Sequence, residues 1–293
     1  MMKFCGIMPA LVTPLDKDER INVPVLHSLI NYLLSEGADG FYVGGATGEG
    51  LALRKSERMI LAEQSVEAIK GKVPCIIQVA STVFPDAVEL AKHAESIGAD
   101  AISATPPLFF GYDEDDVYNY YKKLAESVHI PVMIYYNPGA GFKFNAKIAA
   151  KMFEVDNITA IKWTSSDYYE MIRLKDITHG EMNIINGPDE MLLMGLSAGA
   201  DGGIGTTYNY MLPIIKSVYQ NFVSGNFTEA QRMQNIADRV IAEAKNYRAI
   251  PAAKAMLEKM GFDVGNASFP MKRYTDEQKN SLFEAVQKIK AEA

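Results

Sequence analysis

The sequence predicts an α/β fold, a (β/α)8 TIM barrel with a C-terminal helical appendix. Eight short segments are apolar on both faces, helix-period segments alternate with them, and the phrase Ser-x-Gly-Ala-Asp recurs at 35–39, 96–100 and 197–201. Apolar strands separated by crossover helices are typical of a parallel sheet that is buried on both sides. Eight such units favour a closed barrel over an open sheet, since no dinucleotide-binding fingerprint opens the first unit.

The predicted strands are 6–12, 40–44, 74–80, 101–105, 132–136, 160–163, 183–186 and 202–205. Helix-period segments between them include 23–35, 56–69, 86–97 and 115–128. The glycine of each repeated phrase is expected to end a helix in the left-handed conformation, and the Ala-Asp after it to lead into the next strand. After Pro213 the pattern is helical through Lys290. We therefore expect the barrel over 1–226 and, with no flexible linker, a helical extension over 227–293 packed on it.

The composition points to an intracellular protein that acts on small molecules. The formal net charge is -7 and no basic run occurs, which argues against a nucleic-acid partner. The N-terminal sequence does not have the pattern of a signal peptide, and no apolar run approaches the ~20 residues that cross a bilayer. We expect no membrane partner and a cytoplasmic location. Cys5 and Cys75 are expected to be buried free thiols, and the four histidines lack any metal-binding spacing, so no metal site is predicted.

Residues that close the predicted strands are the candidates for an active site, because the sites of such barrels lie at the carboxyl ends of the strands. Lys162 lies in an apolar strand, where a charged ammonium loses its hydration. This loss favours the neutral amine, the form that attacks a ketone to make an imine. The alternative is a lysine that reaches water at the barrel rim or pairs with a carboxylate.

Three other segments at the predicted strand ends carry candidate groups. The segment 44–50, Gly-Gly-Ala-Thr-Gly-Glu-Gly, fits either a tight turn or a nest of backbone N–H groups that binds a carboxylate, with Thr47 adding a hydroxyl. Tyr135 is either a proton-transferring phenol or a core aromatic. Asp189 and Glu190 are either acceptors for substrate hydroxyls or, for Asp189, the N-cap of the next helix. Thr206 follows the eighth strand.

Together these residues resemble the dihydrodipicolinate synthase/N-acetylneuraminate lyase family of class I pyruvate-dependent aldolases, along essentially the whole chain. The resemblance rests on 44–49, Tyr135, Ile161-Lys162 and 198–205. It implies a lyase without a cofactor that holds pyruvate as a covalent imine on Lys162. It further implies that Thr47 and the backbone N–H of Ala46 bind the pyruvate carboxylate, that Tyr135 transfers the proton, and that the chain forms a homotetramer.

Within this family the segments 162–164, 186–190 and 205–209 look most like the N-acetylneuraminate lyase branch. The residues that this branch implies for substrate binding are Thr164, Gly187, Asp189, Glu190, Ile204 and Thr206. The dihydrodipicolinate branch carries an arginine shortly after its tyrosine, and 137–143 contains none. The expected reaction is reversible cleavage of N-acetylneuraminate, or of a similar 2-keto-3-deoxy sugar acid, to pyruvate and an aldehyde. The alternatives are 4-hydroxy-tetrahydrodipicolinate synthesis and another sugar-acid aldolase or dehydratase reaction.

Two positions depart from the family pattern. Ala46 stands where a serine or threonine is usual, and Phe109 stands where an aromatic hydroxyl is usual. Neither side chain can carry a proton, so a non-catalytic barrel that binds keto acids is an alternative of another class. Thr47, Tyr136 and Tyr112 are possible substitutes in the relay. We favour Tyr135 over Tyr136 as the proton carrier because it stands four residues after Pro131.

Overall fold

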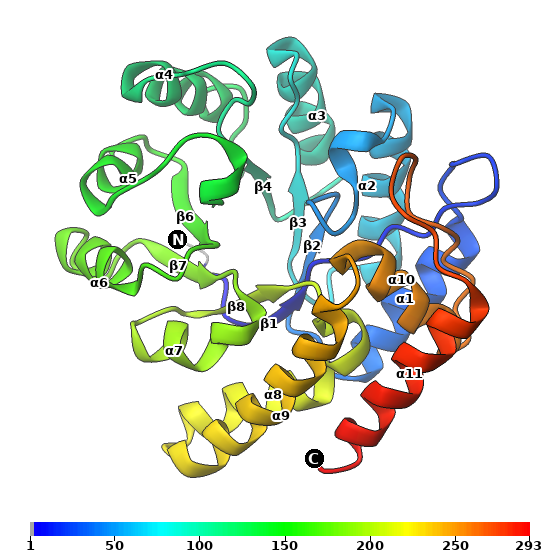
Figure 1. Ribbon diagram of the computed structural model, residues 1–293. Coiled ribbons are helices and arrows are strands. Elements are labelled where there is room, and N and C mark those ends of the chain that lie inside the picture. The colour runs from blue at the N-terminus through cyan, green and yellow to red at the C-terminus, as the bar shows by residue number, and fades with distance from the viewer. Residues whose placement is uncertain (1–2) are drawn as a thin grey trace.

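The computed structural model describes residues 3–293 (Figure 1). Eight parallel strands form one sheet in the order β1-β8-β7-β6-β5-β4-β3-β2. A bridge between Ala10 and Tyr42 closes the sheet between β1 and β2, and the N–H of Leu11 donates to the carbonyl of Tyr42 at 2.9 Å. The predicted α/β fold with a (β/α)8 TIM barrel is confirmed.

All the strands are buried along their length. They are β1 Gly6–Pro9, β2 Phe41–Val43, β3 Cys75–Gln78, β4 Ala101–Ala104, β5 Val132–Tyr136, β6 Ile158–Trp163, β7 Asn183–Asn186 and β8 Gly202–Gly205. The bounds of β5, β7 and β8 match the sequence prediction. The first four strands end earlier than predicted: after β1 and β3 the ladder continues only as single contacts, such as the N–H of Val79 donating to the carbonyl of Ser103 at 2.8 Å, and the residues beyond build loops at the carboxyl end of the barrel.

The helices of the βα units pack around the outside of the strands (Figure 1). They are α1 Val23–Ser35, α2 Lys55–Ile69, α3 Phe84–Ser96, α4 Glu114–Ala125, α5 Ala146–Phe153, α6 Tyr168–Ile177, α7 Leu192–Ser197 and α8 Tyr208–Val223. Short 3-10 turns follow three strands: η1 Gly50–Ala52, η2 Pro138–Ala140 and η3 Asp189–Met191. Side-chain caps fix some of the helix starts; Asp113, for example, accepts the N–H of Asp116 in a capping box that begins α4.

The C-terminal extension consists of α9 Phe227–Lys245, α10 Ala249–Lys259 and α11 Asp276–Lys290. Helix α9 packs against α8, and α11 packs against α9 and α10. The expectation of helix through Lys290 is wrong for the segment that joins α10 to α11. Gly261 takes a left-handed φ of 98° there, which ends the helix, and the N–H of Leu15 donates to the carbonyl of Val264 at 3.0 Å. The division into units at 226 and 227 stays a prediction.

The repeated Ser-x-Gly-Ala-Asp phrases join helix to strand as predicted. Gly37, Gly98 and Gly199 have φ of 88°, 85° and 96°, values that favour glycine. Each aspartate accepts a backbone N–H from the neighbouring strand: Asp39 from Ile7, Asp100 from Cys75 and Asp201 from Ile184. The repeats therefore tie together the amino-terminal ends of adjacent strands, at the opposite end of the barrel from the candidate site residues.

Alternation along the strands separates two apolar layers. Side chains such as Tyr42, Tyr135 and Ile204 fill the barrel interior, whereas Tyr136 and Trp163 belong to the larger core between strands and helices. Since successive side chains of a strand point to opposite faces, Lys162 shares the inward face of β6 with Ala160. The barrel thus directs Lys162 toward its own interior.

The remaining expectations from composition have mixed outcomes. Both cysteines are free, and Cys75 is buried as predicted, but Cys5 is exposed. Burial is wrong for Cys5 because it precedes β1 at the amino-terminal edge of the barrel. Within residues 3–293 no helix is both long and apolar enough to span a membrane. In the same range no three His, Cys, Asp or Glu side chains gather as a possible metal site.

Candidate active site

Lys162 lies on β6 directly opposite Tyr135 of β5 in the register of the sheet. Its Nζ is 4.4 Å from the centroid of the Tyr135 ring and 4.8 Å from that of Tyr42. The residue is 5% exposed, and among residues 3–293 no carboxylate forms an ion pair with it. The two alternatives raised from the sequence, a lysine in water at the rim and an ion-paired lysine, therefore do not describe its surroundings.

Tyr42 is a neighbour of this amine that the sequence analysis missed. Its hydroxyl donates to Ser103 Oγ at 3.0 Å, and Ser103 in turn donates to the carbonyl of Met133 at 2.9 Å. Burial raises the pKa of Tyr42 well above its ordinary value, so the phenol stays neutral. The rings of Tyr42 and Tyr135 meet edge to face at 5.9 Å. The two rings therefore enclose the amine in a fixed aromatic setting.

Tyr136 is turned away from Lys162. Its ring packs against Trp163 at 4.7 Å and against Phe144 at 5.5 Å, in the layer outside the barrel. Of the two adjacent tyrosines, Tyr135 is thus the one beside the amine. Its role as a proton carrier stays a prediction.

The glycine-rich loop after β2 has free donors. Thr47 Oγ1 lies 2.7 Å from Thr206 Oγ1, so the loops after β2 and β8 are joined. Among the described residues no acceptor pairs with the backbone N–H of Ala46 or Thr47. Ala46 is exposed and Thr47 is buried. Adjacent unpaired N–H groups beside a hydroxyl form a suitable pocket for a carboxylate.

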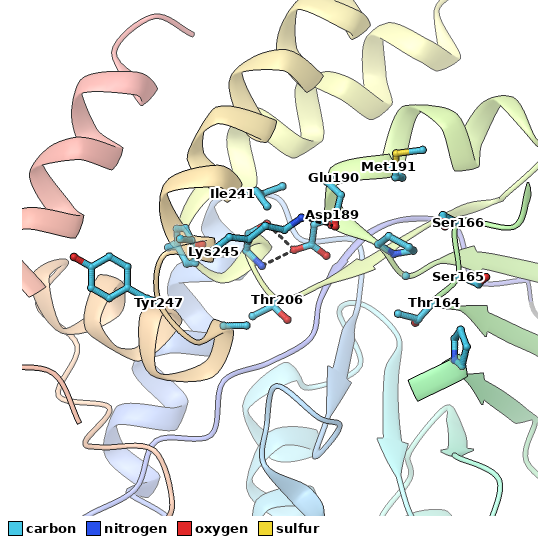
Figure 2. A pocket seen from close by; sticks show the side chains of 17 residues that line it. Thr164, Ser165, Ser166, Asp189, Glu190, Met191, Thr206, Ile241, Lys245 and Tyr247 are labelled. Carbon is cyan, nitrogen blue, oxygen red and sulfur yellow. Dashed lines mark hydrogen bonds and ion pairs between the residues drawn. The ribbon is translucent and has the colours of Figure 1, made fainter. Parts of the chain in front are cut away.

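Two cavities open at the carboxyl ends of the strands. The larger, of about 570 Å³, brings together five of the predicted substrate-binding residues: Thr164, Gly187, Asp189, Glu190 and Thr206 (Figure 2). The smaller, of about 270 Å³, is lined by Ala46, Tyr135, Thr105 and mostly apolar side chains. Segments 137–140 and 249–250 border both cavities, which therefore lie side by side. Lys162 is a neighbour of one lining residue of each cavity. Tyr135 of the smaller cavity pairs with it across the sheet, and Thr164 of the larger cavity lies two residues further along the chain.

Asp189 is a largely buried residue in the wall of the larger cavity. One of its oxygens, Oδ2, accepts the N–H of Thr207 at 2.8 Å and its hydroxyl at 2.6 Å. Burial raises the pKa of Asp189 to about 6, against the lowering effects of the Thr207 hydrogen bonds and the charge of Lys162. The alternative that Asp189 is a helix N-cap is wrong: the capping position is Pro188, and the carboxyl turns instead toward the loop after β8.

Gly187 lets the chain approach Thr164 closely. A Cβ at this position would collide with Thr164 Oγ1, so a glycine is required sterically. The same Oγ1 is buried and has no hydrogen-bond partner among residues 3–293. A buried hydroxyl without a partner costs stability. A ligand that forms a hydrogen bond with the Thr164 hydroxyl would remove this cost, so the hydroxyl is a candidate for substrate binding.

Glu190 has a cationic partner that sequence reasoning did not find. Lys245, the last residue of α9, places Nζ 3.0 Å from Glu190 Oε1, and Figure 2 shows its side chain extending toward the acidic pair. The C-terminal extension therefore contributes to the wall of the cavity. No signal in the sequence indicates this contact, because the packing of α9 on the barrel is a tertiary feature.

The structure does not bring every predicted residue to a cavity wall. Ile204 is fully buried in the barrel interior, and its substrate-binding role stays a prediction. Phe109 is 92% exposed with a left-handed φ of 81°. Of the possible relay substitutes, the Thr47 hydroxyl is engaged by Thr206, while Tyr112 packs against Phe110.

The chain is similar to known proteins in both sequence and structure. The model of the dihydrodipicolinate synthetase family matches residues 3–289. The N-acetylneuraminate lyase of Rhizobium meliloti is 33% identical over 290 residues, covering 99% of this chain and 97% of that protein. The 4-hydroxy-tetrahydrodipicolinate synthase of Oceanobacillus iheyensis is 31% identical over 285 residues, with 96% of each covered.

Solved structures agree with these sequence matches. The crystal structure of CdNal from Clostridium difficile in complex with mannosamine has a TM-score of 0.94 and 31% identity, over 98% of this chain and 100% of that one. Family members of both kinds are lyases, so the prediction of a lyase is confirmed at this level. The family match over nearly the whole length, with relatives above 30% identity, shows that the chain belongs to the dihydrodipicolinate synthetase family.

Proposed function

We propose that the protein forms a Schiff base between Lys162 and pyruvate and reversibly cleaves N-acetylneuraminate or a similar 2-keto-3-deoxy sugar acid. One observation carries the proposal: the buried amine of Lys162, without a carboxylate partner among residues 3–293, lies beside Tyr135, and Tyr135 shares a cavity wall with Ala46 of the loop whose N–H groups are unpaired. A desolvated amine with no counter-ion is suited to attack a ketone. No metal or cofactor is needed for this chemistry.

The proposed reaction has four steps. The neutral Lys162 amine adds to C2 of the keto acid, and loss of water gives a positively charged imine. Tyr135 gives its phenolic proton to the hydroxyl that leaves as water. The resulting phenolate takes the proton from the 4-hydroxyl as the C3–C4 bond breaks, and the electron pair of that bond moves into the imine to give an enamine. The enamine then takes a proton at C3, and water releases pyruvate from Lys162. The N–H groups of Ala46 and Thr47 hold the carboxylate throughout.

The larger cavity supports a substrate with several hydroxyls. Its wall includes Thr164, Asp189, Glu190 and Thr206, which carry hydroxyl and carboxyl groups, and each bound hydroxyl needs a partner to replace water. Relatives named N-acetylneuraminate lyase and a neighbour solved with mannosamine are in keeping with this substrate class.

Dihydrodipicolinate-type synthesis is the second candidate, favoured by the Oceanobacillus iheyensis relative. A substrate panel separates the two. We expect pyruvate release from N-acetylneuraminate or another sugar acid, and little product from pyruvate with aspartate semialdehyde. Turnover restricted to the semialdehyde would overturn the proposed substrate, whereas pyruvate binding without any turnover would favour a binding role.

Three further points stay proposals. We propose a homotetramer, a cytoplasmic location, and a barrel at 1–226 carrying an extension at 227–293. The resemblance to the family supports the tetramer, and light scattering on the purified protein tests it directly; a monomer would contradict it.

A further inference from the structure

A buried ion pair joins the glycine-rich loop to the C-terminal extension. Lys254 Nζ lies 2.8 Å from Glu49 Oε1, and the two side chains are 3% and 0% exposed. Lys254, on α10, also donates to the carbonyl of Asn266 at 2.9 Å. The second oxygen of Glu49 accepts the N–H of Ser268 at 2.6 Å. The pair therefore connects the loop after β2 with α10 and with the segment that follows α10, more than 200 residues later in the sequence.

Glu49 is held in a backbone conformation that side chains avoid. Its φ is 57°, in the left-handed region, which is unfavourable for a residue with a Cβ. Its N–H donates to the carbonyl of Ala46 at 3.0 Å, so Glu49 belongs to the same hydrogen-bonded turn as the N–H donors of Ala46 and Thr47. Such a conformation persists where surrounding contacts hold it, and the buried ion pair supplies these contacts.

The other partner belongs to an element that borders the site. Ile250 of α10 and Met271 of the following segment line the smaller cavity together with Ala46 and Tyr135. Burial lowers the pKa of Lys254, while the charge of Glu49 opposes this effect. A desolvated ion pair that loses one partner leaves an uncompensated charge, so the loop and the extension depend on each other.

We propose that Glu49 and Lys254 are positioning residues, whose ion pair holds the N–H groups of Ala46 and Thr47 where they bind the carboxylate of a 2-keto acid. This inference rests on the proposed function, because it assumes that the keto acid binds at this loop. Within the described residues no hydrogen bond or ion pair joins either side chain to Lys162. Loss of the pair should therefore weaken keto-acid binding more than it slows the imine chemistry.

The test measures pyruvate affinity and folding in parallel. Pyruvate is titrated against each protein in the presence of borohydride, and the half-saturating concentration is taken from the mass of the adduct. Lys254→Met is expected to raise this concentration about tenfold, since a loop displaced by a fraction of an ångström loses its aligned donors. The trapping rate at saturating pyruvate should change little.

Lys279→Met is the matched control. It removes the partly exposed ion pair of Lys279 with Glu258 of α10, whose atoms are 2.7 Å apart, with the same change of side chain and charge. This variant should alter the half-saturating concentration by less than about twofold. The proposal would be overturned if Lys254→Met bound pyruvate as tightly as the wild type while its melting temperature fell at least as far as that of Lys279→Met. The ion pair would then have only a structural role.

A second variant covers the case in which Lys254→Met does not fold. Glu49→Gln/Lys254→Met removes both charges, keeps an oxygen for the N–H of Ser268, and is expected to fold and bind pyruvate more weakly than the wild type. Wild-type affinity in it would also overturn the proposal. Calorimetry with pyruvate measures affinity without borohydride reduction. A wild type that binds pyruvate but gives no reduced adduct would refute the imine and leave the proposed role of the ion pair standing. The pyruvate affinities of the variants would then still test that role.

Discussion

Asp189 is a buried carboxyl group whose ionisation should destabilise the fold. Burial raises its pKa from 3.8 to about 6, so the folded chain keeps a proton where the unfolded chain has lost it. The stability that the protonated group contributes is fully present below pH 3.8 and is lost as the pH rises through about 6. The difference between these two values corresponds to about 3 kcal/mol.

Asp189→Asn tests this pH dependence. The amide oxygen still accepts the N–H of Thr207, but the side chain no longer titrates. The assay is urea unfolding of both proteins from about pH 4 to about pH 8, at one protein concentration. The free energy of unfolding of the variant, relative to the wild type, should rise by up to about 3 kcal/mol over this range.

Thr207→Val is the companion variant. It removes the hydroxyl that donates to Asp189 Oδ2 and lowers the pKa of this carboxyl, so the pH window of stability loss should move upward. The free energies of unfolding of the wild type and of Asp189→Asn could instead differ by the same amount at every pH. This result would refute the reasoning that burial keeps the proton on Asp189.

Three further variants test the site. Tyr135→Phe should lower kcat by about a hundredfold or more while the borohydride adduct on Lys162 still forms, and normal turnover would remove Tyr135 from the mechanism. Gly187→Ala drives a methyl group into Thr164, so KM for the sugar acid should rise about tenfold with pyruvate trapping unchanged; an unaltered KM would contradict this. Ala46→Ser adds a hydroxyl to the wall of the cavity that Tyr135 also lines, and steady-state kinetics should show a higher kcat; an unchanged or lower kcat would argue against an impaired relay.

The sequence predicts the barrel well because its signals are local. Each strand is a short apolar run, and each glycine of the repeated phrase ends a helix in a conformation that costs other residues energy. Placing Lys162 and Tyr135 on two neighbouring strands also follows from local patterns. The sequence does not predict that Lys162 and Tyr135 lie directly opposite each other in the sheet register; this pairing is seen in the structure.

The parts of the site that the sequence does not reveal depend on tertiary packing. Tyr42 looks like any aromatic of a buried strand until its ring is placed beside the amine. Lys245 belongs to a helix whose orientation on the barrel has no local signature, and it lies beside Glu190 after the chain has folded back. Asp189 resembles an N-cap by position, yet its bonds to Thr207 cross between two loops.

The most direct test of the account is identification of the residue that pyruvate modifies. The protein is incubated with pyruvate and borohydride, digested, and mapped by mass spectrometry beside a Lys162→Met variant. We expect one reduced pyruvate adduct, on the peptide that contains Lys162, and none on the variant. An adduct on another lysine, or an unmodified Lys162 at saturating pyruvate, would contradict this expectation.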